Sequence, residues 1–421
     1  MISSLLSDAL AISARWLSDL DLVALTEERL GVSGLLAPDV TVDVVAIGKA
    51  SREMADAAAL VLGERLRRRL TICDEASAAA RERTPDVVVG EHPIPGEGSL
   101  RAGVALLAFL DDPARADCVV FLLSGGASSL CVVPEAPITL EDLRGLWDAA
   151  MTSGVDITIL NQLRASTSAI AGGGVLHHVR ATRSRSLILV DNVISGPSWV
   201  ASGLTYGYRP TSAEVTGLLE RVGLVATPLG QRVLAASSNR DDSMTALTTQ
   251  HQNDVLAEPS MTLAAAVAEA RRRGYRVVDM GSGVHGDVKD VSREWSEVLR
   301  AEVSSSDVVA LLGVGEVTVK VRGPGTGGRC QEFAWRMAKE VAEFQRDAVF
   351  VARASDGRDF VDGVGGAWVE RSTIDQARRR GIDWSVVARA NDTHTALSAL
   401  GQLLDGGHTG WNLCDLYVAL T

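Results

Sequence analysis

Short runs of β-branched and aliphatic residues alternate, in the first half of the chain, with longer segments rich in Ala, Leu and Arg. Three of these runs, residues 41–47, 117–123 and 186–190, are typical of buried strands. Each is followed by a turn that begins with Gly, Ser or Asp. The repeated order of strand, turn and helix predicts an α/β fold with a doubly wound, mostly parallel sheet. We expect its site at the carboxyl ends of the strands.

The alternation breaks between residues 236 and 254, where few large apolar residues occur. We therefore expect a domain boundary there, with a Rossmann-like N-terminal domain at 1–240 and a second α/β domain at 255–421. For the second domain the pattern predicts helices near 263–273, 292–304 and 330–345, strands at 275–278, 307–312 and 348–354, and a glycine-rich loop at 323–328.

Composition excludes several classes of function. The 421 residues, 46% of them hydrophobic and 22% charged, suit a folded protein of two domains. A formal net charge of -12 argues against nucleic acid as a partner. No apolar run approaches the ~18 residues of a membrane-spanning helix, so we expect no membrane partner. The five cysteines are widely spaced and the N-terminus lacks a signal-peptide pattern, which together favour a cytoplasmic protein.

Lysine is rare in this chain. Only Lys49, Lys289, Lys320 and Lys339 occur, and every other Lys/Arg position is arginine. Lys49 stands in Gly48-Lys49-Ala50, directly after the first predicted strand and before a helical pattern. A lysine beside a helix N-terminus suits an anion such as phosphate. An isolated GKA is more often a surface lysine in a tight turn, but the choice of lysine at a strand end in a chain that otherwise prefers arginine favours the anion site.

Two loops of small residues are candidates for anion binding. Residues 124–129 (SGGASS) follow the second predicted strand, and their backbone N–H groups suit an anion nest. Residues 323–328 deliver Arg329 to the start of a helix, and arginine binds carboxylates and phosphates in bidentate fashion. Each loop also has a purely structural interpretation, as a tight turn or as a flexible hairpin with a solvated arginine.

Carboxylates and one histidine complete the candidate chemistry. Asp191 and Asp356 each follow a predicted strand, where a carboxylate suits magnesium binding or removal of a hydroxyl proton. Asp356-Gly357 is also a common turn dipeptide. His92 lies in the stiff segment EHPIP and suits a cleft wall, whereas the other histidines have no metal-ligand spacing. The G-x-S-x-G pattern is absent, so a serine hydrolase has little support.

Taken in order, these segments resemble the glycerate 2-kinase family, the class whose C-terminal half is called the MOFRL domain. The resemblance runs from about residue 44 to the C-terminus. It is carried mainly by GKASREMA at 48–55, EHPIPGEGS at 91–99, LSGGASSL at 123–130, GEVTVKVRGPGTGGRCQE at 315–332 and SDG at 355–357. Any one of these motifs is weak, but their order and spacing together are specific.

The resemblance implies phosphorylation of the 2-hydroxyl of D-glycerate, dependent on ATP and Mg²⁺, in a cleft between the two domains. Lys49 would neutralise phosphate charge, Asp191 would orient or deprotonate the hydroxyl, and Arg329 would hold the substrate carboxylate or the transition-state oxygens. Asp356 would serve the metal. The implied partners are a small hydroxy acid and a nucleotide, and a homodimer stays open. The implied binding residues are His92, Ser124, Gly125, Gly126, Ser128, Asn161, Arg164, Ser202, Glu332 and Asn412.

The chain also departs from the family pattern. Four positions that are usually basic or histidine in the family hold other residues here: Ala165, Ser166, Ala171 and Gly174. Two positions that are usually acidic hold Ser195 and Gly196. This loss of charge leaves three hypotheses: a glycerate-2-kinase-like enzyme acting on D-glycerate or a related hydroxy acid, an enzyme with altered substrate or reaction that no longer uses ATP, and a binding protein without catalysis. The retained lysine in GKA favours the first.

Overall fold

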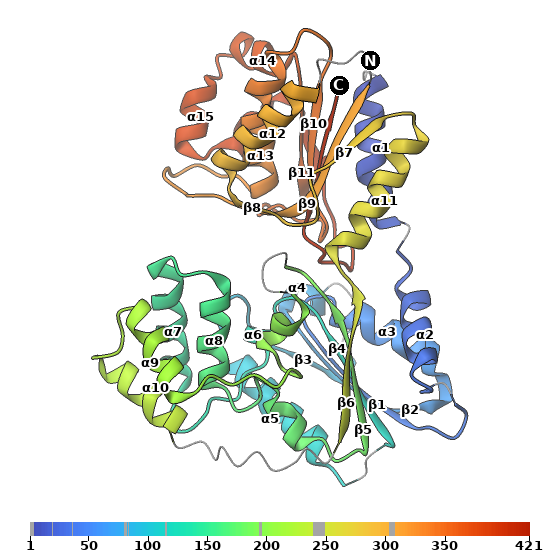
Figure 1. Cartoon of the computed structure of the whole chain (residues 1–421), viewed down its shortest axis with the longest axis vertical. Helices are drawn as coiled ribbons and strands as arrows, with labels where there is room; N and C mark the ends of the chain where they lie inside the picture. The colour runs from blue at the N-terminus through green and yellow to red at the C-terminus, as the bar shows by residue number, and fades with distance from the viewer. Residues whose placement is uncertain are drawn as a thin grey trace. The chain divides into compact units, whose positions relative to one another are not determined.

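The computed structural model describes residues 4–18, 20–35, 37–79, 82, 84–113, 116–192, 196–238, 249–302 and 308–421. The chain divides into two compact units. The first unit contains residues 21–257, and the second unit combines residues 1–20 with residues 258–421. In Figure 1 the second unit therefore contains both ends of the colour scale, the dark blue N-terminal helix and the yellow-to-red C-terminal elements.

A six-stranded sheet forms the centre of the first unit, and all of its neighbouring strands are parallel. Its order is β3-β2-β1-β4-β5-β6, the order of a doubly wound dinucleotide-binding sheet, so the predicted fold class is confirmed. The strands are β1 (Val42–Ile47), β2 (Leu66–Cys73), β3 (Val87–Val89), β4 (Cys118–Leu123), β5 (Arg183–Leu189) and β6 (Gln250–Ala257).

Helices cover this sheet on both faces, which explains why β1 and β4 are buried along their whole length. On one face α5 contacts β2 and β3, and its Leu106 and Leu110 belong to the same apolar cluster as Val119 and Phe121 of β4. On the other face α3 contacts β1 and β2, and α2 packs on α3 (Figure 1). The helices around the sheet are α2 (Leu22–Val32), α3 (Ser51–Leu62), α4 (Glu75–Ala79), α5 (Glu97–Asp111) and α6 (Ala127–Leu130).

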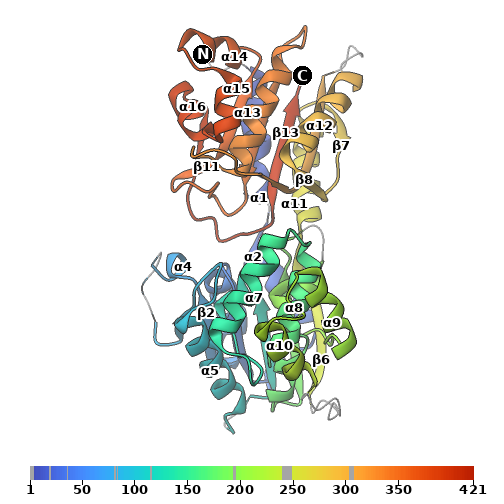
Figure 2. The same ribbon diagram turned by 90° about the vertical axis from the view of Figure 1, so that its left-hand side faces the viewer.

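Four further helices of the first unit pack on one another around a separate apolar cluster, which includes Leu146, Trp147 and Leu219. They are α7 (Leu140–Ser153), α8 (Ile157–Thr167), α9 (Ser212–Arg221) and α10 (Pro228–Ser238), seen together in Figure 2. Capping residues explain where several of them begin. Thr139 forms a capping box with Asp142, Asp156 caps α8, and Thr211 forms a capping box with Glu214.

The second unit has a mixed sheet in the order β12-β11-β10-β13-β9-β7, with β8 paired to β9. β7 and β8 run parallel to β9, and the other pairs are antiparallel. The strands are β7 (Arg276–Asp279), β8 (Val284–Asp287), β9 (Val309–Thr318), β10 (Val349–Ala354), β11 (Val364–Glu370), β12 (Leu403–Asp405) and β13 (Asp415–Leu420).

One face of this sheet is packed against α12 and α13 through Trp295, Phe333, Phe350 and Tyr417, whose rings meet at centroid distances of 4.7–6.0 Å. The opposite face contacts α1 and α11. The helices of the second unit are α1 (Ser4–Ser18), α11 (Pro259–Arg272), α12 (Val288–Glu302), α13 (Arg329–Ala342), α14 (Thr373–Arg379), α15 (Trp384–Ala390) and α16 (Thr393–Leu400).

The division into units differs from the expected boundaries at two places. Residues 1–20 belong to the second unit, because α1 buries Leu6, Ile12 and Trp16 in its contacts with α11, β10 and β13. Residues 250–257 are not part of a linker but form β6 of the first sheet. The expected boundary segment also includes residues 239–248, which lie outside the described residues, as does Asp307 at the start of the predicted strand 307–312.

Among the described residues, none of the helices is long and apolar enough to cross a membrane. All five cysteines are free thiols in buried positions.

Candidate functional site

The candidate site lies at the carboxyl edge of the first sheet, around the loops that follow β1, β3, β4 and β5. These loops contain Lys49, His92, Ser124 and Asp191. β1 lies between β2 and β4, so the strand order reverses its direction there. In open α/β sheets ligands bind at the carboxyl ends of the strands beside such a reversal. The fold therefore brings together, at one edge, predicted residues that are up to 142 positions apart in the sequence.

The turns after β1 and β4 are locked onto each other. The Lys49 N–H donates to the Gly125 carbonyl at 2.9 Å, and the Ala50 N–H donates to Ser124 Oγ at 3.2 Å. Gly48 has φ of 133°, and a Cβ there would overlap the Ser124 side chain, so only glycine fits this crossing. Because α3 begins at Ser51 without a side-chain cap, its first N–H groups lie beside this turn.

Three titratable side chains lie around the locked turns. A Cβ on Gly126 would be 3.1 Å from His92 Cδ2 and 3.3 Å from Lys49 Cγ, so both side chains flank this glycine. Burial raises the pKa of Asp191, and the positive charge of Lys49 partly opposes the effect. The pKa of His92 is lowered by desolvation of its ring and by the charges of Lys49 and Arg164. At neutral pH the site thus contains a lysine cation, a carboxylate with raised proton affinity and a neutral imidazole.

A second group of predicted residues lines a narrow cavity next to these turns. Ser202 Oγ lies 2.8 Å from Ser128 Oγ and 3.4 Å from Asn161 Oδ1, and Arg164 Nη1 donates to the same Asn161 oxygen at 3.3 Å. Ser202 has φ of 52°, a left-handed backbone that is uncommon outside glycine and often marks a functional site. The cavity, about 20 Å³, is lined by Ile47, Ala127, Ser128, Cys131, Val132, Leu143, Trp147, Arg164, Ser168, Ile170, Ala171, Ala201, Ser202 and Leu204.

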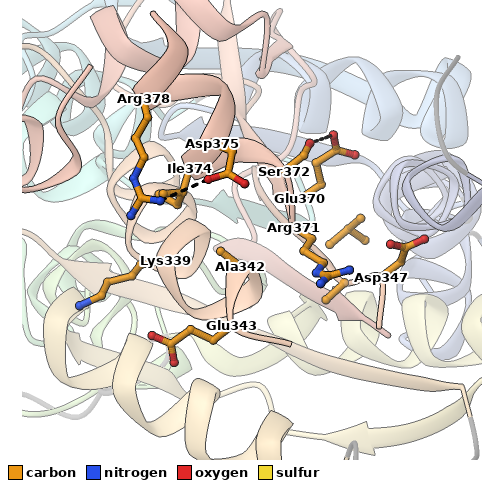
Figure 3. A pocket seen from close by; sticks show the side chains of 12 residues that line it. Lys339, Ala342, Glu343, Asp347, Glu370, Arg371, Ser372, Ile374, Asp375 and Arg378 are labelled. Carbon is orange, nitrogen blue, oxygen red and sulfur yellow. Dashed lines mark hydrogen bonds and ion pairs between the residues drawn. The ribbon is translucent and has the colours of Figure 1, made fainter. Parts of the chain in front are cut away.

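The second unit has a larger hollow, an open groove of about 630 Å³ between α13, α14 and the ends of β10 and β11. Its charged side chains are of both signs, as Figure 3 shows for Arg378, which forms an ion pair with Asp375 at 3.2 Å. Glu370 likewise accepts a hydrogen bond from Ser372 at 2.5 Å. Open exposure and balanced charge give this groove no preference for an anionic ligand, and none of the predicted site residues lines it.

Arg329, the predicted substrate arginine, is already neutralised by two carboxylates. Its Nε and Nη2 donate to Asp415 at 2.9 and 3.2 Å, and its Nη1 pairs with Glu316. Burial opposes the charge, but Asp415 and Glu316 outweigh it and raise the pKa of Arg329 well above its usual value. In this arrangement the guanidinium binds protein carboxylates, and a substrate anion would have to compete with both.

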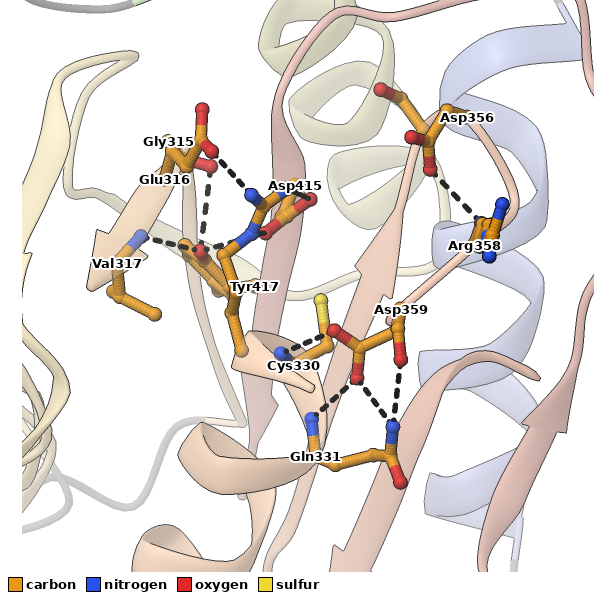
Figure 4. Close-up of polar contacts among 12 residues, drawn as sticks. Gly315, Glu316, Val317, Cys330, Gln331, Asp356, Arg358, Asp359, Asp415 and Tyr417 are labelled. Atoms are coloured by element: carbon orange, nitrogen blue, oxygen red, sulfur yellow. Dashed lines mark hydrogen bonds and ion pairs between the residues drawn. The ribbon is translucent and has the colours of Figure 1, made fainter. Parts of the chain in front are cut away.

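Sequence reasoning missed the carboxylate that fixes this region. Asp359 accepts hydrogen bonds from the backbone N–H groups of Cys330 and Gln331 at 3.0 and 2.9 Å, and from Gln331 Nε2 (Figure 4). It thereby caps α13 from a distant loop. Burial raises the pKa of Asp359 to about 6, and the neighbouring charge of Asp415 adds to the effect. The signal available in the sequence was the helix start at Arg329, which has no local capping residue.

Three other predicted residues lie elsewhere in the second unit. Asp356 accepts the Arg358 N–H at 2.9 Å inside the SDG turn. Glu332 is buried and accepts a hydrogen bond from Asn391 at 3.1 Å, and Asn391 in turn holds the loop at Arg322. Asn412 lies in the connection between β12 and β13. The described residues contain no group of three or more His, Cys, Asp or Glu side chains that could hold a metal ion.

Comparisons with known proteins cover both units of the chain. Residues 20–236 match the model of a domain of unknown function, DUF4147, and residues 309–415 match the MOFRL family. A glycerate kinase from Bos taurus is 28% identical, with coverage of 89% of this chain and 83% of that protein. A D-glycerate 2-kinase from Thermotoga maritima is 27% identical over 90% of both chains. The chain belongs to the glycerate 2-kinase family.

One further relative of this glycerate 2-kinase family member has a different name, and two solved structures share its fold. A putative hydroxypyruvate reductase from Agrobacterium vitis is 29% identical, over 90% of this chain and 98% of that protein. Among solved structures, a glycerate kinase from Thermotoga maritima superposes with a TM-score of 0.84, at 25% identity and with 98% of both chains covered. A Pyrococcus horikoshii protein gives 0.74 at 24% identity, over 100% of this chain and 99% of that one.

The structure explains one departure from the glycerate 2-kinase pattern, the glycine at position 174. A Cβ on Gly174 would overlap the guanidinium of Arg209, which donates to the Ala169 carbonyl at 2.5 Å. An arginine from a later segment therefore occupies the space beside the glycine. Ala165 and Ala171 are buried alanines, and these two positions therefore contribute neither charge nor exposed surface. Gly196 donates to Asn192 Oδ1 at 3.0 Å, and Ser195 lies outside the described residues.

Proposed function

We propose that the protein is an ATP-dependent kinase that phosphorylates the 2-hydroxyl of D-glycerate or a related 2-hydroxy acid. One observation supports this proposal above the others: Lys49 and Asp191 interact electrostatically at the carboxyl edge of a Rossmann-ordered sheet, where Lys49 follows the strand beside the switch point. Phosphoryl transfer requires mainly positive charge and positioning. The names of the bovine and Thermotoga relatives support the same activity.

The roles of the two side chains follow from their environments. In the proposed reaction the 2-hydroxyl oxygen forms a bond to the γ-phosphorus of MgATP, the bond to the β,γ-bridging oxygen breaks, and ADP leaves. Asp191 accepts the hydroxyl proton, and its raised pKa makes it a better base than an ordinary carboxylate. Lys49 supplies positive charge to the phosphoryl oxygens during transfer.

Magnesium enters this proposal as part of the substrate MgATP. A resident metal cage has no support among the described residues, since they offer no cluster of three or more ligating side chains. A single protein carboxylate with phosphate oxygens is the donor set that Mg²⁺ commonly uses with nucleotides. We propose Asp356 for that carboxylate.

The name of the Agrobacterium relative suggests a second activity, reduction of hydroxypyruvate, for which a dinucleotide is one candidate reductant. A dinucleotide site on this fold normally uses G-x-G-x-x-G after the first strand, for close approach of the pyrophosphate. Here the corresponding segment is Gly48-Lys49-Ala50-Ser51-Arg52-Glu53, with one glycine and a lysine. This segment favours the kinase over the reductase.

The test is an assay of the purified full chain with MgATP and D-glycerate. We expect release of ADP and formation of 2-phosphoglycerate, identified by phosphorus NMR. Calorimetry with ATP alone gives an independent measurement of nucleotide binding. Absence of product from D-glycerate and from a panel of 2-hydroxy acids would contradict the kinase. Absence of nucleotide binding as well would favour an altered enzyme on the same scaffold.

A further inference from the structure

Arg164 is a partly buried cation that has no carboxylate partner among the described residues. It lies on α8, and its Cζ is 4.2 Å from the ring centroid of Trp147 on α7. Its Nη1 donates to Asn161 Oδ1 at 3.3 Å, while its Nε is shielded from solvent and has no acceptor within the described part of the chain. No carboxylate of the described residues lies within 4.0 Å of the guanidinium.

Other partly buried arginines of this unit are paired. Arg68 Nη2 lies 2.5 Å from Asp43, Arg69 Nε lies 2.6 Å from Asp86, and Arg185 Nε lies 2.5 Å from Asp254. Burying a charge without a counter-ion costs free energy, so buried charges in proteins are normally paired. Burial lowers the pKa of Arg164 to about 10, which still leaves it protonated at neutral pH. A permanent charge without a protein partner is typical of a site that a ligand completes.

The surroundings of Arg164 indicate which ligand. The face of Trp147 fixes the plane of the guanidinium, and this leaves its edge for a carboxylate. The adjacent cavity has room for about one water-sized group and presents the hydroxyls of Ser128 and Ser202 beside apolar walls. We propose that Arg164 binds the carboxylate of the acceptor 2-hydroxy acid. This inference rests on the proposed kinase function and makes Arg164 a specificity-determining residue.

Arg329 is the competing candidate for the same role. Its guanidinium already pairs with Asp415 and Glu316, whereas that of Arg164 has one neutral hydrogen bond. Transfer of a substrate carboxylate onto Arg164 neutralises a buried charge. Transfer onto Arg329 requires that an existing ion pair be broken. The electrostatic balance thus favours Arg164.

The test compares a charged and a neutral acceptor in the full-length enzyme. In Arg164→Met we expect the KM for D-glycerate to rise about 30-fold or more, with the KM for ATP changed less than about threefold. The wild-type preference for D-glycerate over D-glyceramide, its neutral amide, should shrink by a similar factor. Arg164→Lys should recover part of the preference, because it restores charge without the planar fork. Arg293→Met, an exposed arginine of the second unit, is the control.

Calorimetry without nucleotide separates this inference from the kinase proposal. If the wild type shows no turnover but binds D-glycerate, and Arg164→Gln does not, the anchor stands and the kinase proposal fails. A second outcome is normal wild-type turnover with an Arg164→Gln variant that a thermal melt shows to be folded and that keeps the full preference for the carboxylate. This outcome overturns the role of Arg164 and leaves the kinase proposal intact. Wild-type protein that neither binds nor phosphorylates any short 2-hydroxy acid overturns both.

Discussion

Two arginines predicted to bind substrate lie in opposite electrostatic surroundings. Arg164 of the first unit stacks on Trp147, with one hydrogen bond to an amide oxygen and no carboxylate beside it among the described residues. Arg329 of the second unit is held by Asp415 and Glu316. Both arginines were expected in the site, Arg329 as a catalytic residue and Arg164 as a binding residue, but only the charge of Arg164 is left for a ligand to neutralise.

The difference shows that a positively charged residue in a family motif is not yet a binding residue. What matters is the charge that remains after the protein's own partners are counted. At the carboxyl edge of the first sheet, desolvation lowers the pKa of His92, and the charges of Lys49 and Arg164 lower it further against the opposing charge of Asp74. At the start of α13, Arg329 is paired with two carboxylates, and burial together with the charge of Asp415 raises the pKa of Asp359. The first region suits anionic ligands, and the second favours internal stability.

The largest expected effect tests the first region. Lys49→Ala should lower kcat by about a thousandfold, because one positive charge at the transferring phosphoryl group is lost. Lys49→Arg should recover little, since a longer planar guanidinium does not reproduce a point charge in this turn. Steady-state kinetics measure both variants, with exposed Lys289→Ala as the control. Wild-type rates from Lys49→Arg would remove Lys49 from the proposed mechanism.

A smaller loss of rate is expected at Asp191. Asp191→Asn should lower kcat by about a hundredfold, because the hydroxyl proton loses its acceptor. Since burial raises the pKa of this carboxyl, wild-type kcat should fall on acidification at a pH above the ordinary aspartate range. The pH dependence of kcat measures this limb, and exposed Asp290→Asn serves as the control. A rate independent of pH down to the usual aspartate pKa would exclude Asp191 as the base.

The paired arginine should affect stability more than binding. Arg329→Met should reduce the free energy of unfolding by about 2–3 kcal/mol, because Asp415 is left buried without its cation. Adding Asp415→Asn should recover part of that loss, so the double variant should be less destabilised than the sum of the two single variants. Urea denaturation measures all three. If Arg329→Met is as stable as the wild type but inactive, Arg329 binds substrate and the contrast with Arg164 fails.

The smallest effect concerns the pH dependence of stability. The folded state holds the Asp359 proton up to about pH 6, whereas the unfolded chain releases it near pH 4. The folded state therefore binds more protons in this interval, and the free energy of unfolding should fall as pH rises through it. Asp359→Asn should flatten that slope by roughly 1–2 kcal/mol across the interval. Urea denaturation at several pH values measures it, with exposed Asp362→Asn as the control. An unchanged slope would show that Asp359 titrates normally.

Strands with continuous apolar runs were predictable from the sequence. β1 and β4 begin within one residue of the expected positions, because both are buried on two faces. β6 was missed because its sequence, QHQNDVLA, is polar. Its side chains are bonded to those of neighbouring segments: His251 Nδ1 lies 2.8 Å from Ser184 Oγ, and Asn253 accepts from Thr205 at 2.7 Å. A polar edge strand of this kind cannot be separated from a linker by hydrophobic pattern alone.

The site could be predicted only as far as motif positions allow. Lys49, Ser124 and Asp191 follow strands of one parallel sheet, so their common edge could be inferred. The pairing of Arg329 with Asp415 spans 86 residues, and that of α13 with Asp359 spans nearly 30. Such contacts depend on tertiary packing and have no local signature. The same holds for Arg209 beside Gly174.

The place of α1 in the second unit has a consequence for synthesis of the chain. Leu6, Ile12 and Trp16 pack on strands that include β13, the last element of the protein. Residues 21–257 can fold during translation, since all six strands of their sheet precede residue 258. The apolar face of α1, however, finds its partners α11, β10 and β13 only in segments that follow the first unit. This helix is therefore fully covered only after β13 has been synthesised, and loss of β13 would expose part of its apolar face.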